Sequence, residues 1–260
     1  MDAFPSPPRD ADSPLSDADS LRNARASRNL AVARWLLGDA GRAVLAALPP
    51  YRSDDVFALT ERLRREGLDA DQAAAALTLS RLRARAAAKF GERAGAMFFT
   101  ADGYEQATRL SVGALHAARF VEAGARRVID FGCGIGADSL AFTLAGLDVA
   151  AIESDPVAAL YAATNAPKAK VTCANGLATE LPDADAIWLD PARRAEDGRR
   201  IASPERWIPP FSRALSLARD FPLAGIKVAP GIAYHALPPR AFVEWISERG
   251  QLLEAVVWLG

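Results

Sequence analysis

The chain has 260 residues, half of them hydrophobic and 24% charged, which is ordinary for a globular protein with one full domain and a smaller one. No apolar run approaches the roughly 18 residues of a membrane span, and no charged start precedes an apolar core as in a signal peptide. Two cysteines and two scattered histidines exclude a disulfide framework and a zinc cluster. We therefore expect a cytoplasmic protein without a metal or a membrane partner.

Charge is unevenly distributed, although the net charge is only −1. Residues 1–20 carry five acids and one base and are rich in Pro, Ser and Asp, so we predict a disordered tail. Residues 21–95 carry fourteen bases and eight acids, a net charge of +6. A basic segment favours nucleic acid, and RNA is a candidate partner. An arginine- and alanine-rich chain from a GC-rich genome would show the same balance without any such function.

Residues 21–95 are predicted to form a helical N-terminal domain. One helix has Asp54 as a plausible N-cap and stops at Gly67, and a second begins near Asp71 and ends at Gly91. No alternation typical of strands appears before residue 125.

Four basic residues of the second helix and its end recur in steps of four: Arg81, Arg85, Lys89 and Arg93. This spacing places them along one helical face. Such a face could follow an RNA backbone, or it could be a solvated surface. Charge reversal at Arg85 and Lys89 would distinguish the two interpretations.

From residue 96 a turn-rich connection leads to an expected helix at 106–123, and short apolar runs then alternate with helices. The runs expected to be strands are Arg127–Phe131, Asp148–Ile152, Lys170–Cys173, Ala186–Leu189, Gly225–Val228 and Glu254–Leu259. Alternating β and α units predict an α/β fold, a Rossmann-like and mainly parallel sheet covered by helices on both faces. We assign this second domain to residues 96–260.

A glycine-rich turn follows the first expected strand. That strand ends at Asp130, and Gly132, Gly134 and Gly136 follow before the next helix. Glycines let the backbone turn sharply and approach a ligand without a Cβ in the way. The second strand ends in Glu153, whose carboxylate can accept hydrogen bonds from both hydroxyls of a ribose. Because neighbouring parallel strands end at the same sheet edge, we predict a cofactor site there.

Two kinds of cofactor, and a turn that binds no ligand, are compatible with these glycines. Gly132, Gly134 and Ala137 also fit the dinucleotide pattern G-x-G-x-x-G/A. Three features favour S-adenosylmethionine (SAM) over NAD or FAD. The carboxylate of Asp130 suits the cationic methionine end, a third glycine completes D-x-G-x-G-x-G, and Asn175 follows the third strand, where it could reach the adenine. The expected SAM-binding residues are Asp130, Gly132, Cys133, Gly134, Gly136, Glu153 and Asn175.

Cys133 could be considered as a nucleophile, because methyltransferases that attack a pyrimidine ring carbon use a cysteine. Neither Cys133 nor Cys173 follows the fourth or fifth strand, where the substrate would lie. A small residue in a tight loop is the simpler interpretation of Cys133.

The fourth strand runs into the sequence Asp190-Pro191-Ala192-Arg193-Arg194. This segment is similar to the D/N-P-P-Y/F loop of amino-directed methyltransferases, in which the acidic or amide residue accepts hydrogen bonds from the target amine. Arg193 takes the position of the aromatic residue, so an adenine or cytosine amine is not implied. An arginine can stack on a base or pair with a phosphate or carboxylate. A turn with a solvated basic run is the alternative.

Four segments together, FTADGYEQATR, the glycine loop, WLDPARR and IKVAPGI, resemble a bacterial family of class I SAM methyltransferases with a THUMP-like domain. That family is distantly similar to the RNA cap guanine-N2 methyltransferases, and the resemblance covers about residues 95–260. It implies SAM as cofactor, RNA as a candidate acceptor, and a reaction site that contains Asp190, Pro191, Arg193 and Lys227.

The resemblance predicts a SAM-dependent methyltransferase that modifies a nitrogen of RNA. Two alternatives stay open: a methyltransferase acting on a protein or small molecule, and a non-catalytic SAM-fold module that binds RNA. Such folds end in an antiparallel pair of strands, and the run at 254–259 reads as the sixth strand. We therefore expect the last strand to be missing and the chain to be a fragment.

Overall fold

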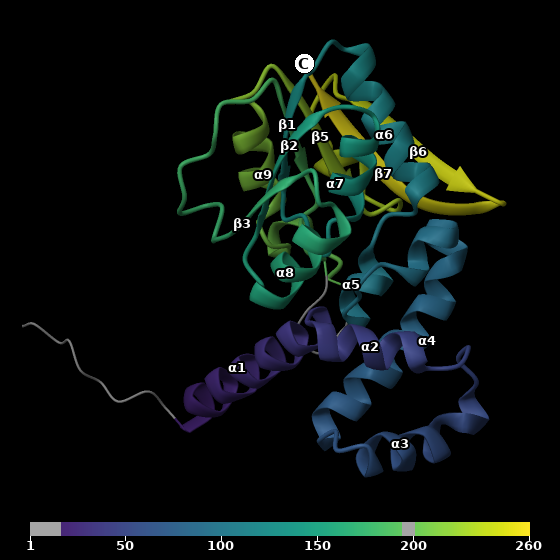
Figure 1. The fold of residues 1–260 in the computed structure, drawn as a ribbon. Coiled ribbons are helices and arrows are strands. Elements are labelled where there is room, and N and C mark those ends of the chain that lie inside the picture. Colours follow the sequence, from purple (N-terminus) through teal and green to yellow (C-terminus); the bar gives the residue numbers. More distant parts are fainter. Residues whose placement is uncertain (1–16, 194–200) are drawn as a thin grey trace, which may run out of the picture.

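The computed structural model describes residues 17–193 and 201–260 (Figure 1). Its described part holds a seven-stranded sheet of order β3-β2-β1-β4-β5-β7-β6. The strands are β1 (Arg127–Phe131), β2 (Asp148–Glu153), β3 (Lys170–Cys173), β4 (Ala186–Leu189), β5 (Leu223–Val228), β6 (Phe242–Glu248) and β7 (Gln251–Leu259). Strands β1 to β5 pair in parallel, and β7 pairs antiparallel with both β5 and β6. The predicted Rossmann-like α/β fold is confirmed.

The prediction that the last strand is missing is wrong. Residues 254–259 belong to β7, and β6 is a strand that the sequence analysis did not recognise. The two strands are joined by Arg249 and Gly250, whose φ angles of 51° and 77° are those of a tight hairpin turn. The β6 sequence FVEWISE carries charged residues at Glu244 and Glu248, and these obscured its strand pattern.

Helices cover both faces of the sheet (Figure 1). On one face, α6 (Leu110–Glu122) and α7 (Ala137–Leu144) pack on the sheet through a cluster that includes Phe120, Phe142 and Trp188. On the other face, α9 (Phe211–Ala218) packs through Phe211 and Ala214. The helix α8 (Pro156–Asn165) follows β2 and contacts β3. This layering leaves the carboxyl edge of the parallel strands open for a ligand.

The N-terminal region is helical, as predicted. Its helices are α1 (Asp17–Leu37), α2 (Asp39–Ala47), α3 (Val56–Arg65) and α4 (Ala70–Phe90). The N-cap of α4 is Asp69, whose side chain forms a reciprocal capping box with Gln72. Since α1 begins at Asp17, the predicted disordered tail is wrong for residues 17–20, and residues 1–16 lie outside the described residues.

A shared hydrophobic cluster holds the N-terminal helices against the sheet domain. It joins Leu36 of α1 and Leu79 of α4 to Ile135 in the glycine loop and Tyr161 of α8. Burial of side chains of this size stabilises the contact by roughly 1.5–3 kcal/mol each. The N-terminal helices are therefore packed against the glycine loop at the carboxyl edge of the sheet.

The helix predicted at 106–123 corresponds to α6, which begins at Leu110, and a short helix that was not predicted lies in the connection before it. This short helix, α5 (Ala101–Gln106), is capped by Thr100, whose hydroxyl accepts a hydrogen bond from the Gly103 amide. The chain is extended at Ala107 and Arg109 before α6 begins. This break places residues 106–108 at the centre of the site described next.

Among the described residues, no helix combines the length and apolarity needed to cross a bilayer.

Candidate functional site

A cavity of about 710 Å³ opens at the carboxyl edge of the sheet. Its floor includes Gly132, Gly134 and Glu153, and Asp190 lies at its border. The N-terminal helices supply another wall, with Val32, Ala33, Leu36, Ala75 and Leu79 among the lining residues. Residues predicted at three strand ends, those of β1, β2 and β4, thus line one cavity, and the wall formed by the N-terminal helices was not predicted.

The conformation of the glycine loop requires glycine, because another amino acid would be strained at these positions. Gly132, Gly134 and Gly136 have φ angles of 77°, 55° and 80°, in the region that favours glycine. At Gly136 a Cβ would also lie 3.0 Å from the Cα of Ala162 in α8. Gly136 therefore serves close packing and does not line the cavity.

Glu153 is held by the backbone on both sides. Its Oε2 accepts a hydrogen bond of 2.8 Å from the Gly134 amide, and its Oε1 accepts one of 2.8 Å from the Asp155 amide. The side chain is only partly buried and lines the cavity. A carboxylate fixed in this way keeps acceptor capacity for hydroxyl groups of a ligand.

The structure does not place Asp130 at the cavity surface, contrary to the predicted contact with the methionine end of SAM. Asp130 is 1% exposed, and its Oδ2 lies 2.5 Å from the hydroxyl of Ser139 in α7. Burial, and then the charge of Asp138, raise the pKa of Asp130 to about 8. A carboxyl group with this pKa is mostly protonated at neutral pH. Asp130 is therefore a buried structural residue beneath the glycine loop, in contact with Ser139.

Asn175 also lies outside the cavity lining. Its side chain is exposed, and its Oδ1 accepts a hydrogen bond of 3.1 Å from the Leu177 amide. The amide thus caps the turn after β3, as Asn commonly does. The contact between Asn175 and an adenine stays a prediction.

Cys133 lines the cavity but is 8% exposed. Burial, and then the charges of Asp130 and Glu153, raise the pKa of its thiol well above the ordinary value. Since the thiolate is the reactive form, this environment opposes a nucleophilic role.

Asp190 and Lys227 form an ion pair where β4 and β5 end. Lys227 Nζ lies 2.7 Å from Asp190 Oδ2 and donates a hydrogen bond of 2.9 Å to the Thr108 hydroxyl. Lys227 is 3% exposed, whereas the Asp190 side chain is 24% exposed. Asp190 Oδ1 has no hydrogen bond among the described residues, so this oxygen is available to a ligand. Pro191 is buried behind the pair.

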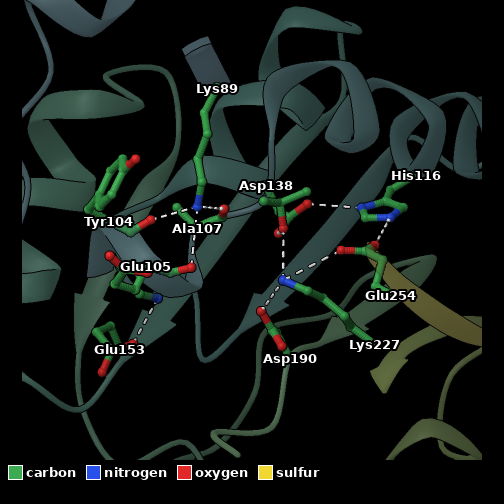
Figure 2. Close-up of polar contacts among 12 residues, drawn as sticks. Lys89, Tyr104, Glu105, Ala107, His116, Asp138, Glu153, Asp190, Lys227 and Glu254 are labelled. Carbon is green, nitrogen blue, oxygen red and sulfur yellow. Dashed lines mark hydrogen bonds and ion pairs between the residues drawn. The ribbon is translucent and has the colours of Figure 1, made fainter. Parts of the chain in front are cut away.

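A chain of buried polar groups extends from this ion pair into the core (Figure 2). The Thr108 hydroxyl donates to Asp138 Oδ2 at 2.6 Å, and Asp138 Oδ1 lies 3.0 Å from His116 Nδ1. On its other side, His116 Nε2 lies 2.7 Å from Glu254 Oε1, close but out of line for an ideal hydrogen bond. The other carboxylate oxygen of Glu254, Oε2, lies 3.9 Å from Lys227 Nζ, so the chain of polar groups leads back to the ion pair.

His116 is fully buried in this chain and carries a positive charge at neutral pH. Burial alone would lower the pKa of His116, but contacts with Asp138 and Glu254 outweigh it and raise the pKa to about 9. The ring also stacks on Trp188, with centroids 4.2 Å apart, an arrangement that favours a cation. Lys227, likewise, has a raised pKa, because Asp190 and Glu254 outweigh the cost of burial.

We expect the charged state of His116 to make the chain less stable as pH rises. Its pKa increases from 6.5 in the unfolded chain to about 9. The stabilisation is therefore fully present below pH 6.5 and is lost as pH rises through about 9, a change of roughly 3 kcal/mol.

Urea unfolding between pH 6 and 9.5 would measure this dependence. His116→Asn should remove much of the slope in this window, whereas substitution of the exposed His235 by asparagine should keep it. Equal slopes in all three proteins would contradict the assignment of a charged His116.

A second cavity, of about 530 Å³, lies beside the first. Gln106, Ala107 and Thr108 line both cavities. Lys227 and Arg193 line only the second, and Lys227 connects the two through its ion pair with Asp190. Of the four residues predicted for the reaction site, Asp190 lines the first cavity, Arg193 and Lys227 line the second, and Pro191 lines neither.

The basic face predicted on the second helix is not a continuous solvated track. Lys89 of α4 turns inward and donates to the carbonyl oxygens of Tyr104, Glu105 and Ala107 at 2.7, 3.3 and 2.9 Å. Arg85 forms an ion pair of 3.2 Å with Glu105. Of the four, only Arg81 and Arg93 are exposed and form no ion pair with another described residue.

Sequence reasoning missed most of the buried network. In the sequence His116 stands alone, and no motif marks Thr108, Asp138 or Glu254. A partial signal existed, because a buried histidine and an acid on adjacent apolar helices need partners. Their meeting with Glu254 depends on the sheet order, which places β7 beside β5.

Residues 28–86 match a family model described as a domain of unknown function (DUF8688). No curated protein matches the chain. Among solved structures, the chain is similar to a candidate methyltransferase from Porphyromonas gingivalis W83, with 18% identity and a TM-score of 0.60, over 81% of this chain and 59% of that one. The chain thus spans less than two thirds of that structure's length.

Weaker likenesses extend to structures with bound SAM or SAH. The O-methyltransferase TomG from Streptomyces achromogenes, in complex with SAM, is 16% identical, with a TM-score of 0.42 over 59% of this chain and 81% of that one. Magnesium protoporphyrin IX methyltransferase from Synechocystis PCC 6803, with bound SAH, is 14% identical, with a TM-score of 0.41 over 57% and 81%. At 18% identity, the likeness to the Porphyromonas gingivalis structure concerns the fold alone: the chain has a Rossmann-like methyltransferase fold.

Proposed function

We propose that this chain is a SAM-dependent methyltransferase that modifies a nitrogen of RNA. One observation carries the proposal: a single cavity joins the glycine loop, Glu153 and Asp190. In a parallel α/β sheet, this edge is where ligands bind. A cofactor that extends from Glu153 across the glycine loop would end beside Asp190.

The residues present suit SAM in kind. The backbone of the exposed Gly132 and the partly buried Gly134 leaves room for the methionine end, and Glu153 can accept from ribose hydroxyls. The apolar Val157 and the helices α1 and α4 offer a surface for the adenine. When bound, SAM supplies a methyl group on a sulfonium, which is already a good leaving group.

Asp190 would receive the methyl acceptor. Its Oδ2 is committed to Lys227, which leaves Oδ1 to accept a hydrogen bond from a target amine. A neutral amine becomes more cationic as it attacks, so an acceptor oxygen here stabilises the transition state more than the ground state. Lys227 and Pro191 would act by holding Asp190 in place.

RNA is the acceptor class that we propose, because two cations in the wall of the second cavity, Lys89 and Arg193, have no acidic partner among the described residues, a distribution suited to a polyanion. The family resemblance to THUMP-like methyltransferases points in the same direction. A protein or small-molecule acceptor is the alternative, and direct measurement of methylated products separates the two.

Glu153→Ala should weaken SAM binding, because losing a hydrogen bond to a charged group costs roughly 1.5–3 kcal/mol, or about tenfold to a hundredfold in Kd. Titration calorimetry with SAM, its demethylated product and NAD would measure it. Glu180→Ala, at an exposed acid outside both cavities, should bind SAM like the unmodified chain. Binding of NAD in place of SAM would overturn the proposed function.

A further inference from the structure

The charges in the wall of the second cavity do not cancel. Most charged side chains there have an opposite partner: Lys227 pairs with Asp190, Arg109 with Glu248 at 2.7 Å, Glu105 with Arg85, and Glu254 with His116. Two cations, Lys89 and Arg193, have no acidic partner within ion-pair distance among the described residues. The cavity wall therefore has an excess of positive charge.

The two unpaired cations differ in what they can offer a ligand. Lys89 gives its N–H groups to three backbone carbonyl oxygens between residues 104 and 107, so it contributes charge. Arg193 is partly buried, and its guanidinium makes no hydrogen bond to another described residue. A guanidinium presents paired N–H donors that match a carboxylate or phosphate. Arg193 thus supplies the donors and Lys89 supports them electrostatically.

The pKa of Lys89 reflects both its burial and the nearby charge of Lys227. Burial, and then the charge of Lys227, lower the pKa of Lys89 to about 8. An anion in the cavity would relieve this repulsion, which a neutral ligand would not. The paired Lys227 and Asp190 separate this excess charge from the cofactor cavity.

We propose that the second cavity binds an oxyanion of the methyl acceptor, a phosphate or a carboxylate, through Arg193 and Lys89. The inference deepens the proposed function by naming the group that the acceptor carries next to its reactive nitrogen. A phosphodiester of RNA satisfies it, and so does a small acid. An acceptor without an anionic group near its nitrogen would not fit.

The test is binding of inorganic phosphate and of acetate to the full chain without SAM, followed by thermal unfolding at constant ionic strength. Phosphate or acetate should raise the Tm in a saturable manner. Arg193→Gln should raise the apparent Kd about tenfold, the effect of losing one hydrogen bond to a charged group, and Arg193→Lys should restore part of the affinity. Tighter binding of phosphate would identify a phosphate site, and tighter binding of acetate a carboxylate site.

Arg213→Gln is the matched control, since Arg213 is exposed on α9 and lines neither cavity. It should bind phosphate like the unmodified chain. Equal affinity in the Arg193→Gln and Arg213→Gln variants, or no saturable binding to the unmodified chain, would overturn the anion site.

SAM titration of the same variants keeps the two proposals apart. Arg193→Gln should leave SAM affinity unchanged, because Arg193 does not line the cofactor cavity. If phosphate bound through Arg193 and SAM did not bind, the anion site would stand and the methyltransferase proposal would fail.

Discussion

Replacing Asp190 with alanine should lower the turnover of methyl transfer by about two orders of magnitude, the typical cost of losing one preorganised polar group. SAM affinity should change little, because the glycine loop and Glu153 form most of the cofactor floor. Turnover measured with saturating SAM, together with calorimetry of the same variant, would show this separation. Full activity of Asp190→Ala would place the catalytic centre elsewhere.

Asp190→Asn sharpens this test because Lys227 fixes the orientation of the side chain. Lys227 can only donate, so the amide oxygen of an asparagine must face it, and the NH₂ group would then face the acceptor. An N–H group of the asparagine would then face an N–H group of the target amine, and neither could accept a hydrogen bond from the other. We therefore expect Asp190→Asn to be nearly as inactive as Asp190→Ala, and a mild loss would contradict direct contact between Asp190 and an amine.

Lys227→Met should destabilise the fold by about 3–5 kcal/mol, since removing one partner of a buried ion pair leaves an uncompensated charge. Lys227 is 3% exposed and faces both Asp190 and Glu254. Urea unfolding would measure the loss.

Lys170→Met is the matched control for Lys227→Met. Lys170 is an exposed lysine of β3, and its replacement should stay within about 0.5 kcal/mol of the unmodified chain. A loss below about 1 kcal/mol for Lys227→Met would contradict the buried charge network.

The parallel half of the sheet could be predicted because each of its strands is a short apolar run followed by a recognisable turn. The glycine loop, Glu153 and the Asp190 loop are local signals of this kind, and the structure brings them to one edge. The final hairpin was misjudged because Glu244 and Glu248 interrupt the apolar pattern of β6. The Arg249-Gly250 turn between β6 and β7 is the sequence feature that could have indicated the hairpin.

The roles of Asp130 and Asn175 could not be decided from sequence, because position at a strand end does not fix the direction of a side chain. Asp130 turns to Ser139, and Asn175 turns to the Leu177 amide. The second cavity depends on contacts between segments far apart in the chain, as when Lys89 of α4 binds the carbonyl groups of residues 104–107. No local pattern encodes such contacts.

The most direct test of the central claim is to incubate the chain with methyl-labelled SAM and separated RNA, protein and small-molecule pools from cells that lack the gene. We predict label in the RNA pool, and its loss when Asp190→Ala replaces the unmodified chain. Label confined to the protein or small-molecule pool would contradict RNA as the acceptor. Absence of label from every pool, with SAM bound, would contradict methyl transfer itself.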